Sequence, residues 1–193
     1  MALVHGQELA SGEEVLTAAP AVLAPFPEPP GDEWDAWLIK GDRATGKTTC
    51  GARWLMASAL AGQEGSLWAV CAPSRDRTRH SLEAVLAQGA AGDVESYSAA
   101  HLEATLRSKA RIKGFSYESP DSIRGLNLSG AWLDDADGMR YYSFWSTGLR
   151  TALRVKPARL VATAALEARW GLVRDLRDAA ENGTGPVCLT VLH

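Results

Sequence analysis

Residues 41–48 read GDRATGKT, and this stretch decides how the chain is expected to fold. Gly41, Gly46, Lys47 and Thr48 match the G-x-x-x-x-G-K-[ST] pattern of phosphate-binding loops at every fixed position. The competing interpretation is a glycine turn that carries a surface lysine. A working loop needs a strand before it and a helix after it, because backbone N–H groups grip phosphate where the loop enters a helix N-terminus.

The segments on both sides of this loop meet that requirement. Before it, DAWLIK (35–40) is a short apolar run suited to a buried strand. After it, TTCGARWLMASALAG (48–62) spaces apolar residues as a helix does and reaches Gly62, a plausible C-terminal cap. The sequence therefore predicts an ATP-binding loop formed by Gly41, Asp42, Arg43, Ala44, Thr45, Gly46, Lys47, Thr48 and Thr49.

Composition and charge set the broader expectations. With 193 residues, 46% hydrophobic and 22% charged, the chain is long enough for one domain with a substantial core. Three scattered cysteines suggest neither a disulfide framework nor a zinc site, which fits a reducing cytoplasm. We expect neither membrane insertion nor export, since no run of about 18 apolar residues and no signal peptide is present. At a net charge of -3, nucleic-acid contact would require a local basic patch.

The chain divides into two parts by composition. Residues 1–31 end in APFPEPPG, whose four prolines predict an extended N-terminal arm. Over 32–193, apolar runs alternate with helical patterns. The expected strands lie near 35–40, 66–72, 130–134, 158–164 and 186–192, and the later helices near 76–88, 141–150 and 168–180. This alternation predicts an α/β P-loop NTPase fold, with a mainly parallel central sheet and helices on both faces.

A nucleotide hydrolase also needs a carboxylate at the end of a second strand. GAWLDDAD (130–137) supplies Asp134 at the end of an apolar run, where it could hold Mg²⁺. Asp135 follows at the position where a base for the attacking water would stand. Alone, such a run is more often an ordinary strand end, but a matching phosphate loop upstream favours the magnesium site.

Three stretches together resemble the ATPase region of the large terminase subunits of tailed bacteriophages. They are WDAWLIKGDRATGKTTCGARWL (34–55), FSYESPDSIRGLNLSGAWLDDAD (115–137) and FWSTGLRTALRVKPARLVATAA (144–165). Their order along the chain is that of the family, and the likeness extends over nearly all of residues 34–192. The resemblance implies an ATPase of a DNA-packaging motor.

The resemblance also implies roles for individual residues. Lys47 would bridge the β- and γ-phosphates of ATP, and Thr48 and Asp134 would hold Mg²⁺. Arg43 matches the additional arginine of the family's phosphate loop. Arg124 matches a position that in some relatives acts as an arginine finger on the ATP of a neighbouring subunit. The alternative for Arg124 is a local salt bridge, for example to Asp121.

Three departures from the family pattern bear on activity. Asp135 stands where the family has a catalytic glutamate, and its shorter reach predicts slower hydrolysis. The threonine run that couples hydrolysis to movement is reduced to VATAAL (161–166), in which Thr163 remains. The nuclease domain that follows in the family is not found before His193, so we expect either that the domain was excised or that the nuclease lies on another chain.

The implied partners are a homo-oligomeric ring of subunits, double-stranded DNA, a procapsid with its portal, and a small terminase subunit, in the host cytoplasm and without a membrane. RSKARIK (107–113) is either a basic ridge that contacts DNA or an edge strand protected by charge. Two alternative functions stay open. One is a nucleotide-binding subunit with weak or no hydrolysis and a structural or regulatory role, and the other is a small-molecule kinase.

Overall fold

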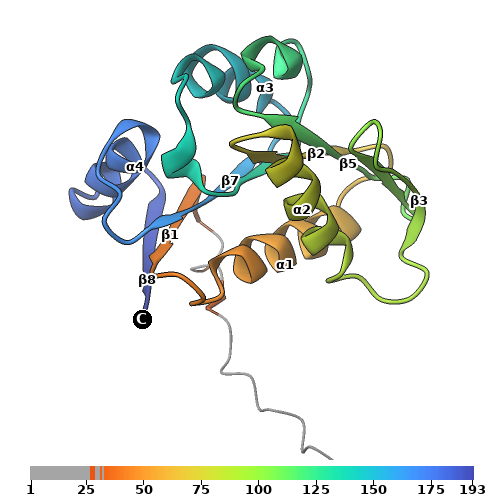
Figure 1. Ribbon diagram of the computed structural model, residues 1–193, viewed down its shortest axis with the longest axis horizontal. Coiled ribbons are helices and arrows are strands. Elements are labelled where there is room, and N and C mark those ends of the chain that lie inside the picture. The colour runs from red at the N-terminus through yellow and green to blue at the C-terminus, as the bar shows by residue number, and fades with distance from the viewer. Residues whose placement is uncertain (1–26, 29–30, 32) are drawn as a thin grey trace, which may run out of the picture.

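The computed structural model describes residues 27–28, 31 and 33–193, which build an eight-stranded sheet covered by helices on both faces (Figure 1). The strand order is β3-β4-β5-β2-β6-β7-β1-β8. Six strands run parallel: β1 Ala36–Gly41, β2 Leu67–Ala72, β5 Arg111–Ser116, β6 Gly130–Leu133, β7 Arg159–Ala165 and β8 Val187–Leu192. The antiparallel strands are β3 Val94–Ser98 and β4 Glu103–Leu106. Most of the arm predicted over 1–31 lies outside the described residues.

Two helices cover one face of the sheet, and shorter elements cover the other. The first face carries α1 Lys47–Leu60 and α2 Arg75–Leu86. The second carries the 3₁₀ turns η1 Pro120–Ile123 and η2 Ala136–Gly138, the π-helix η3 Phe144–Leu149, α3 Arg150–Ala152 and α4 Gly171–Glu181. The predicted fold class is thereby confirmed. Among the described residues, no helix is long and apolar enough to cross a membrane.

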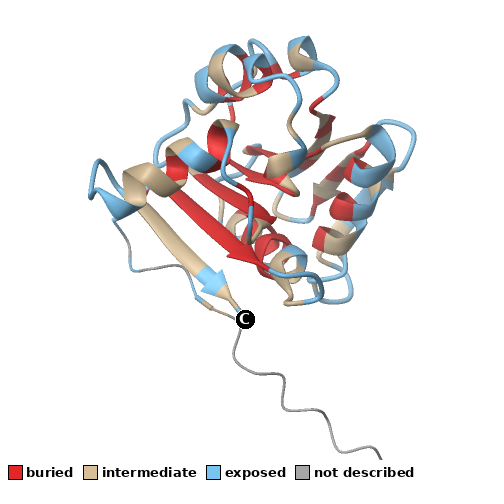
Figure 2. Ribbon diagram, turned by 60° about the vertical axis from the view of Figure 1, so that its left-hand side comes forward, coloured by how far each residue is buried: buried red, intermediate tan, exposed pale blue. Residues whose placement is uncertain are grey.

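Alternation along each strand produces two separate cores. In β1, Trp37 and Ile39 pack toward α1, whereas Leu38 packs toward the opposite face. In β6, Trp132 and Leu133 divide in the same way. Figure 2 shows the central strands buried, with exposed residues on the outer sides of the helices. Because both faces are covered, these strands read as continuous apolar runs in the sequence.

Helix α1 lies unusually close to the sheet at one residue. A Cβ atom placed on Gly51 would come within 2.2 Å of Trp132 Nε1, a distance that real Cβ atoms do not reach. The missing side chain therefore lets the helix pack directly on the indole ring in β6.

The segment between α2 and β6 differs most from the prediction. β3 and β4 were not predicted. Both interpretations of RSKARIK assumed that 107–113 is extended throughout, and this is wrong because the chain turns at Lys109, where φ is +65°, so that β5 begins only at Arg111. The edge-strand interpretation is also wrong, since β5 lies between β2 and β4. Three of the four basic side chains of RSKARIK (107–113) pair locally: Lys109 with Glu95 at 2.7 Å, and Arg111 and Lys113 each with Glu103 at 3.2 Å.

The helix expected over 141–150 begins later than predicted. The chain enters a helical turn only at Phe144, which is fully buried, and winds as a π-helix before α3. The preceding residues form an exposed loop. The spacing of apolar residues in this segment predicts that a helical turn is buried, but it does not distinguish a π-helix from an α-helix.

Candidate nucleotide-binding site

The phosphate-binding motif forms the connection from β1 to α1. β1 ends at Gly41 and α1 begins at Lys47. Gly46, immediately before the helix, has a φ of +87°, a conformation that costs glycine little. Thr45 Oγ1 donates to the carbonyl of Asp42 at 2.9 Å and closes the turn. The strand, loop and helix expected around GDRATGKT are therefore present.

The side chain of Lys47 folds back over this loop. Its Nζ donates to the carbonyl of Gly41 at 2.8 Å and also to the carbonyl of Asp42. The ammonium group is thus held above the loop by two neutral acceptors. An anionic phosphate would offer a stronger, charge-assisted partner at the same place.

Asp134 is the carboxylate at the centre of the site. It follows β6, is only 8% exposed, and accepts hydrogen bonds from three hydroxyl groups. Thr48 Oγ1 lies 3.3 Å and Thr163 Oγ1 2.9 Å from Oδ1, and Ser81 Oγ lies 2.8 Å from Oδ2. Burial raises the pKa of Asp134, and the bonds from Ser81, Thr163 and Thr48 oppose that rise.

The backbone of Asp134 is fixed as firmly as its side chain. The buried Tyr117 hydroxyl lies 2.8 Å from the carbonyl of Asp134 and 3.2 Å from that of Cys71, so it bridges the ends of β6 and β2. Burial raises the pKa of Tyr117 well above its usual value, which keeps this hydroxyl a donor. The main chain that carries the Asp134 carboxylate is therefore held in a fixed position relative to β2.

Thr48 and Asp134 together suit a magnesium ion. Their hydroxyl and carboxylate oxygens come from α1 and the end of β6, and they are already neighbours at 3.3 Å. Mg²⁺ prefers hard oxygen ligands and is usually held by one or two protein groups together with phosphates and water. These residues fit that ion.

Asp135 lies beside Asp134 but points into a different environment. Its φ of +50° is uncommon for a residue other than glycine. Asp135 Oδ2 lies 2.7 Å from Arg77 Nη2, and the two side chains are 37% and 64% exposed. Arg77 belongs to the first turn of α2. In the sequence it stands in the basic run SRDRTRH (74–80), without a sign that it would reach Asp135.

A cleft of about 900 Å³ lies at the carboxyl ends of the parallel strands. It is bordered by the phosphate loop, by the start of α2 and by the segments that follow β6 and β7. Its lining residues are Gly41, Asp42, Arg43, Lys47, Pro73, Arg77, Asp135, Asp137, Gly138, Ala165 and Glu167. Sequence reasoning missed Asp137 and Glu167, because single acidic residues carry no spacing signal.

Arg124 lies apart from this cleft. It follows η1, where Nη1 lies 2.6 Å from Asp121 Oδ1 and Nη2 donates to Thr147 Oγ1 at 3.1 Å. It is about half exposed and does not line the cleft described above. Within one subunit, the local salt bridge is therefore the arrangement that this arginine adopts.

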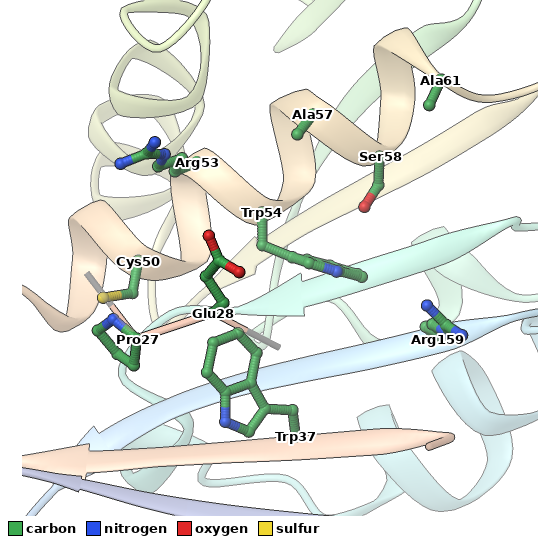
Figure 3. Close-up of a pocket in the computed structure, with 10 residues that line it drawn as sticks. All are labelled: Pro27, Glu28, Trp37, Cys50, Arg53, Trp54, Ala57, Ser58, Ala61 and Arg159. Carbon is green, nitrogen blue, oxygen red and sulfur yellow. The ribbon is translucent and has the colours of Figure 1, made fainter. Parts of the chain in front are cut away.

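A second cavity of about 460 Å³ lies along α1 (Figure 3). Trp37, Cys50, Arg53 and Trp54 line it, and Pro27 and Glu28 border it from the opposite side. Trp37 is itself fixed, since its Nε1 donates to Thr190 Oγ1 at 2.9 Å. The cavity therefore combines aromatic walls with polar groups, beginning at the first turn of α1.

The parallel sheet, the phosphate loop and the buried Asp134 define the class of a P-loop NTPase fold. The particular form of this fold is that of large terminase ATPase domains. No family model matches the sequence, and no curated protein matches it either. Solved structures do match, all at low sequence identity.

Three of these structures illustrate the likeness. The large terminase ATPase domain of Thermus phage P74-26 matches with a TM-score of 0.60 and 18% identity over 69% of this chain. The large terminase of bacteriophage HK97 gives 0.68 and 18% over 82%. That of a thermophilic bacteriophage, in complex with ADP, gives 0.66 and 16% over 82%. This chain spans 61%, 35% and 40% of these proteins, respectively.

Proposed function

We propose that this chain is the ATPase domain of a viral DNA-packaging motor, and that it hydrolyses ATP to move double-stranded DNA into a procapsid. The observation that carries the proposal is the contact between Thr48 and Asp134, which joins the phosphate loop to a buried carboxylate at 3.3 Å. The terminase fold around this pair supports the choice among P-loop functions. The proposed domain occupies residues 32–193.

The proposed chemistry assigns each charged group one task. Lys47 and Arg43 bind the phosphates, and Thr48 and Asp134 would hold Mg²⁺, which neutralises phosphate charge when bound. Asp135 orients the attacking water and accepts its proton, yielding ADP and inorganic phosphate. Arg77, whose Nη2 lies 2.7 Å from Asp135 Oδ2, orients this carboxylate at the cleft.

The proposed base site is the cavity beside α1. It begins at Cys50, within two residues of Thr48. Its lining includes Trp37 and Trp54, which are 1% and 7% exposed, so a purine would pack against the small part of these rings that the cavity reaches. Tryptophan fluorescence should therefore change when ATP binds, and it should change less for an inorganic triphosphate without a base. An equal response to both ligands would exclude this base site.

Assembly follows from the proposed role of Arg124. This arginine lies outside the cleft of its own subunit, so any contact with ATP must occur across an interface in a ring of copies. A procapsid portal, a small terminase subunit and a nuclease domain on another segment or chain are the further partners of the proposed motor, which would work in the host cytoplasm. DNA contact is part of the same proposal.

One assay tests the main proposal. Steady-state ATP turnover is measured with and without double-stranded DNA, using Asp134→Ala as the inactive reference. We expect Mg²⁺-dependent turnover that DNA stimulates. Turnover equal to the reference under both conditions, with nucleotide shown to be bound, would refute the motor.

The second candidate function is a nucleotide-binding subunit with weak or no hydrolysis. The specific observation in its favour is that Asp135, already shorter than glutamate, is held by Arg77 at 2.7 Å. Such a subunit would use ATP as an assembly ligand. It predicts tight nucleotide binding together with turnover at the level of the Asp134→Ala reference.

A further inference from the structure

Positive charge is concentrated in one part of this chain. Between Met139 and Arg174 the sequence has seven arginine and lysine residues and only one acidic residue, a formal charge of +6. The whole chain carries -3. Not all of these cations lie together, since Arg159 lies over the Trp34 ring and Lys156 lines a cavity beside Trp68. Asp175 directly follows the segment. The local basic patch that nucleic-acid contact would need can come only from the other arginines of the segment.

Three of these arginines have no carboxylate to neutralise them. Arg140, Arg150 and Arg169 are exposed and form no ion pair with any described residue. By contrast, Lys109, Arg111 and Lys113 in the region of β4 and β5 are paired with glutamates. The charge of the three arginines is thus available to an anionic ligand.

Exposed aromatic rings lie among these arginines. Trp170 is 63% exposed and Tyr141 is 54% exposed, although most tryptophans of this chain are buried in the core. Tyr141 directly follows Arg140, and Trp170 directly follows Arg169. Large apolar rings placed in water next to unpaired guanidinium groups are typical of a binding surface.

One hydrogen bond joins the two segments that carry these residues. The Tyr142 hydroxyl donates to Asp175 Oδ2 at 2.7 Å, which ties the loop before η3 to α4. The charges of Arg150 and Arg174 oppose the rise that this bond causes in the pKa of Tyr142, so both lie nearby. The surface also adjoins the cleft, since Arg140 and Arg169 each follow a cleft-lining residue, Gly138 and Glu167, by two positions.

We propose that the surface formed by Arg140, Tyr141, Arg150, Arg169 and Trp170 binds single-stranded nucleic acid. The arginines contact phosphates, while the two rings stack on unpaired bases. An unpaired strand fits better than a duplex, because paired bases do not present their faces to a protein surface. The inference goes beyond the proposed function, which concerns duplex DNA, and it requires no ATP hydrolysis.

The test is binding of a fluorescent oligothymidine of about 15 nucleotides, measured by anisotropy without ATP. The variants are Tyr141→Ala with Trp170→Ala, and Arg140→Gln with Arg169→Gln. The matched control is Tyr97→Ala with Lys109→Gln, since Tyr97 is also an exposed ring and Lys109 is an exposed cation on the other side of the sheet. Circular dichroism verifies that each variant is folded.

We expect the aromatic variant to bind about tenfold more weakly for each ring lost, and Trp170→Phe to retain most of the affinity. The arginine variant should lower the slope of log K against log salt by about 1.4, as expected for two lost phosphate contacts. The control variant should bind like the wild type.

Three results would overturn the inference. They are unchanged affinity in a folded aromatic variant, an equal loss in the control variant, and binding of a blunt duplex or a polyglutamate peptide as tight as that of the oligothymidine. Because no ATP is present, loss of the proposed ATPase function would leave this measurement unaffected. The two proposals can therefore fail separately.

Discussion

Arg77 Nη2 and Asp135 Oδ2 lie 2.7 Å apart and join the first turn of α2 to the segment that follows β6. Both groups line the cleft next to the phosphate loop. The pair is partly exposed, so its contribution to folding is small, about 0–1 kcal/mol. The role that we propose for the pair is instead to orient Asp135.

This pairing predicts the effect of removing Arg77. In Arg77→Ala, turnover should fall about tenfold or more, because the carboxylate loses the group that aims it. Combining Arg77→Ala with Asp135→Ala should cost little beyond Asp135→Ala alone, since both act through one carboxylate. Single-turnover rates of the four proteins measure this coupling. Strictly additive losses would show that Arg77 acts independently.

The length of the Asp135 side chain predicts opposite results for two substitutions. Asp135→Glu should preserve or raise turnover, because it restores the reach of the family's glutamate. Asp135→Asn should lower turnover about 100-fold or more while ATP stays bound, the scale expected for losing a general base. Equal single-turnover rates for wild type and Asp135→Asn, with ATP shown to be bound to both, would favour the nucleotide-binding subunit with weak or no hydrolysis.

Lys47 should affect binding and not folding. Within the described part of the chain, its side chain donates hydrogen bonds to the loop carbonyls of Gly41 and Asp42, so Lys47→Ala should remove a proposed phosphate contact without opening the core. We expect loss of ATP affinity by calorimetry and an unchanged melting temperature. The matched control is Lys109→Ala, which removes an exposed lysine away from the cleft. ATP affinity equal to that of the wild type would contradict the assigned role.

The buried carboxylate of Asp134 predicts a dependence of stability on pH. Its pKa in the folded state is raised above the ordinary value of 3.8, so the folded protein holds this proton more tightly than the unfolded chain. The free energy of unfolding should therefore decrease as pH rises from about 4 through the raised pKa.

Asp134→Asn should remove this decrease and be more stable than the wild type at pH 7 without Mg²⁺. Ser81 can accept a hydrogen bond from the new amide while its own proton goes to the carbonyl of Arg77, 2.9 Å away. Urea unfolding between pH 4 and 8 measures the effect. The same loss of stability in both proteins would assign it to another group.

Arg124 offers a test of assembly. If it acts on the ATP of a neighbour, a mixture of Arg124→Ala and Lys47→Ala subunits should recover part of the activity, because each supplies what the other lacks. Turnover is measured at concentrations where association is verified. No recovery there would leave Arg124 with its local partners, Asp121 and Thr147.

The phosphate loop and the buried parallel strands could be predicted, because each requires a recognisable pattern in the sequence. Lys47, Thr48 and Asp134 are identifiable because strand ends, loop and helix start have fixed spacing. β3 and β4 were missed because their exposed faces break the apolar runs, as in β3, where no residue is fully buried. The basic pattern in RSKARIK suggested continuous extension across a turn.

The remaining site residues could not be predicted because they meet only in three dimensions. Ser81 lies in the second turn of α2 and Thr163 within β7, yet both donate to Asp134. Arg77 reaches Asp135 across 58 positions of the sequence. No local pattern encodes such contacts, since they depend on which strands are neighbours in the sheet.

The close approach of Gly51 to Trp132 makes the proposed nucleotide site sensitive to a residue that does not line the cleft. Any side chain at residue 51 would overlap with the Trp132 ring and act as a wedge between α1 and β6. Helix α1 would have to move away from the sheet to relieve the overlap. The first turn of that helix carries Thr48, whereas Asp134 stays with the sheet, so the wedge would separate the two oxygens that now lie 3.3 Å apart. The spacing of the two oxygens in the proposed magnesium site thus depends on the absence of a side chain at Gly51.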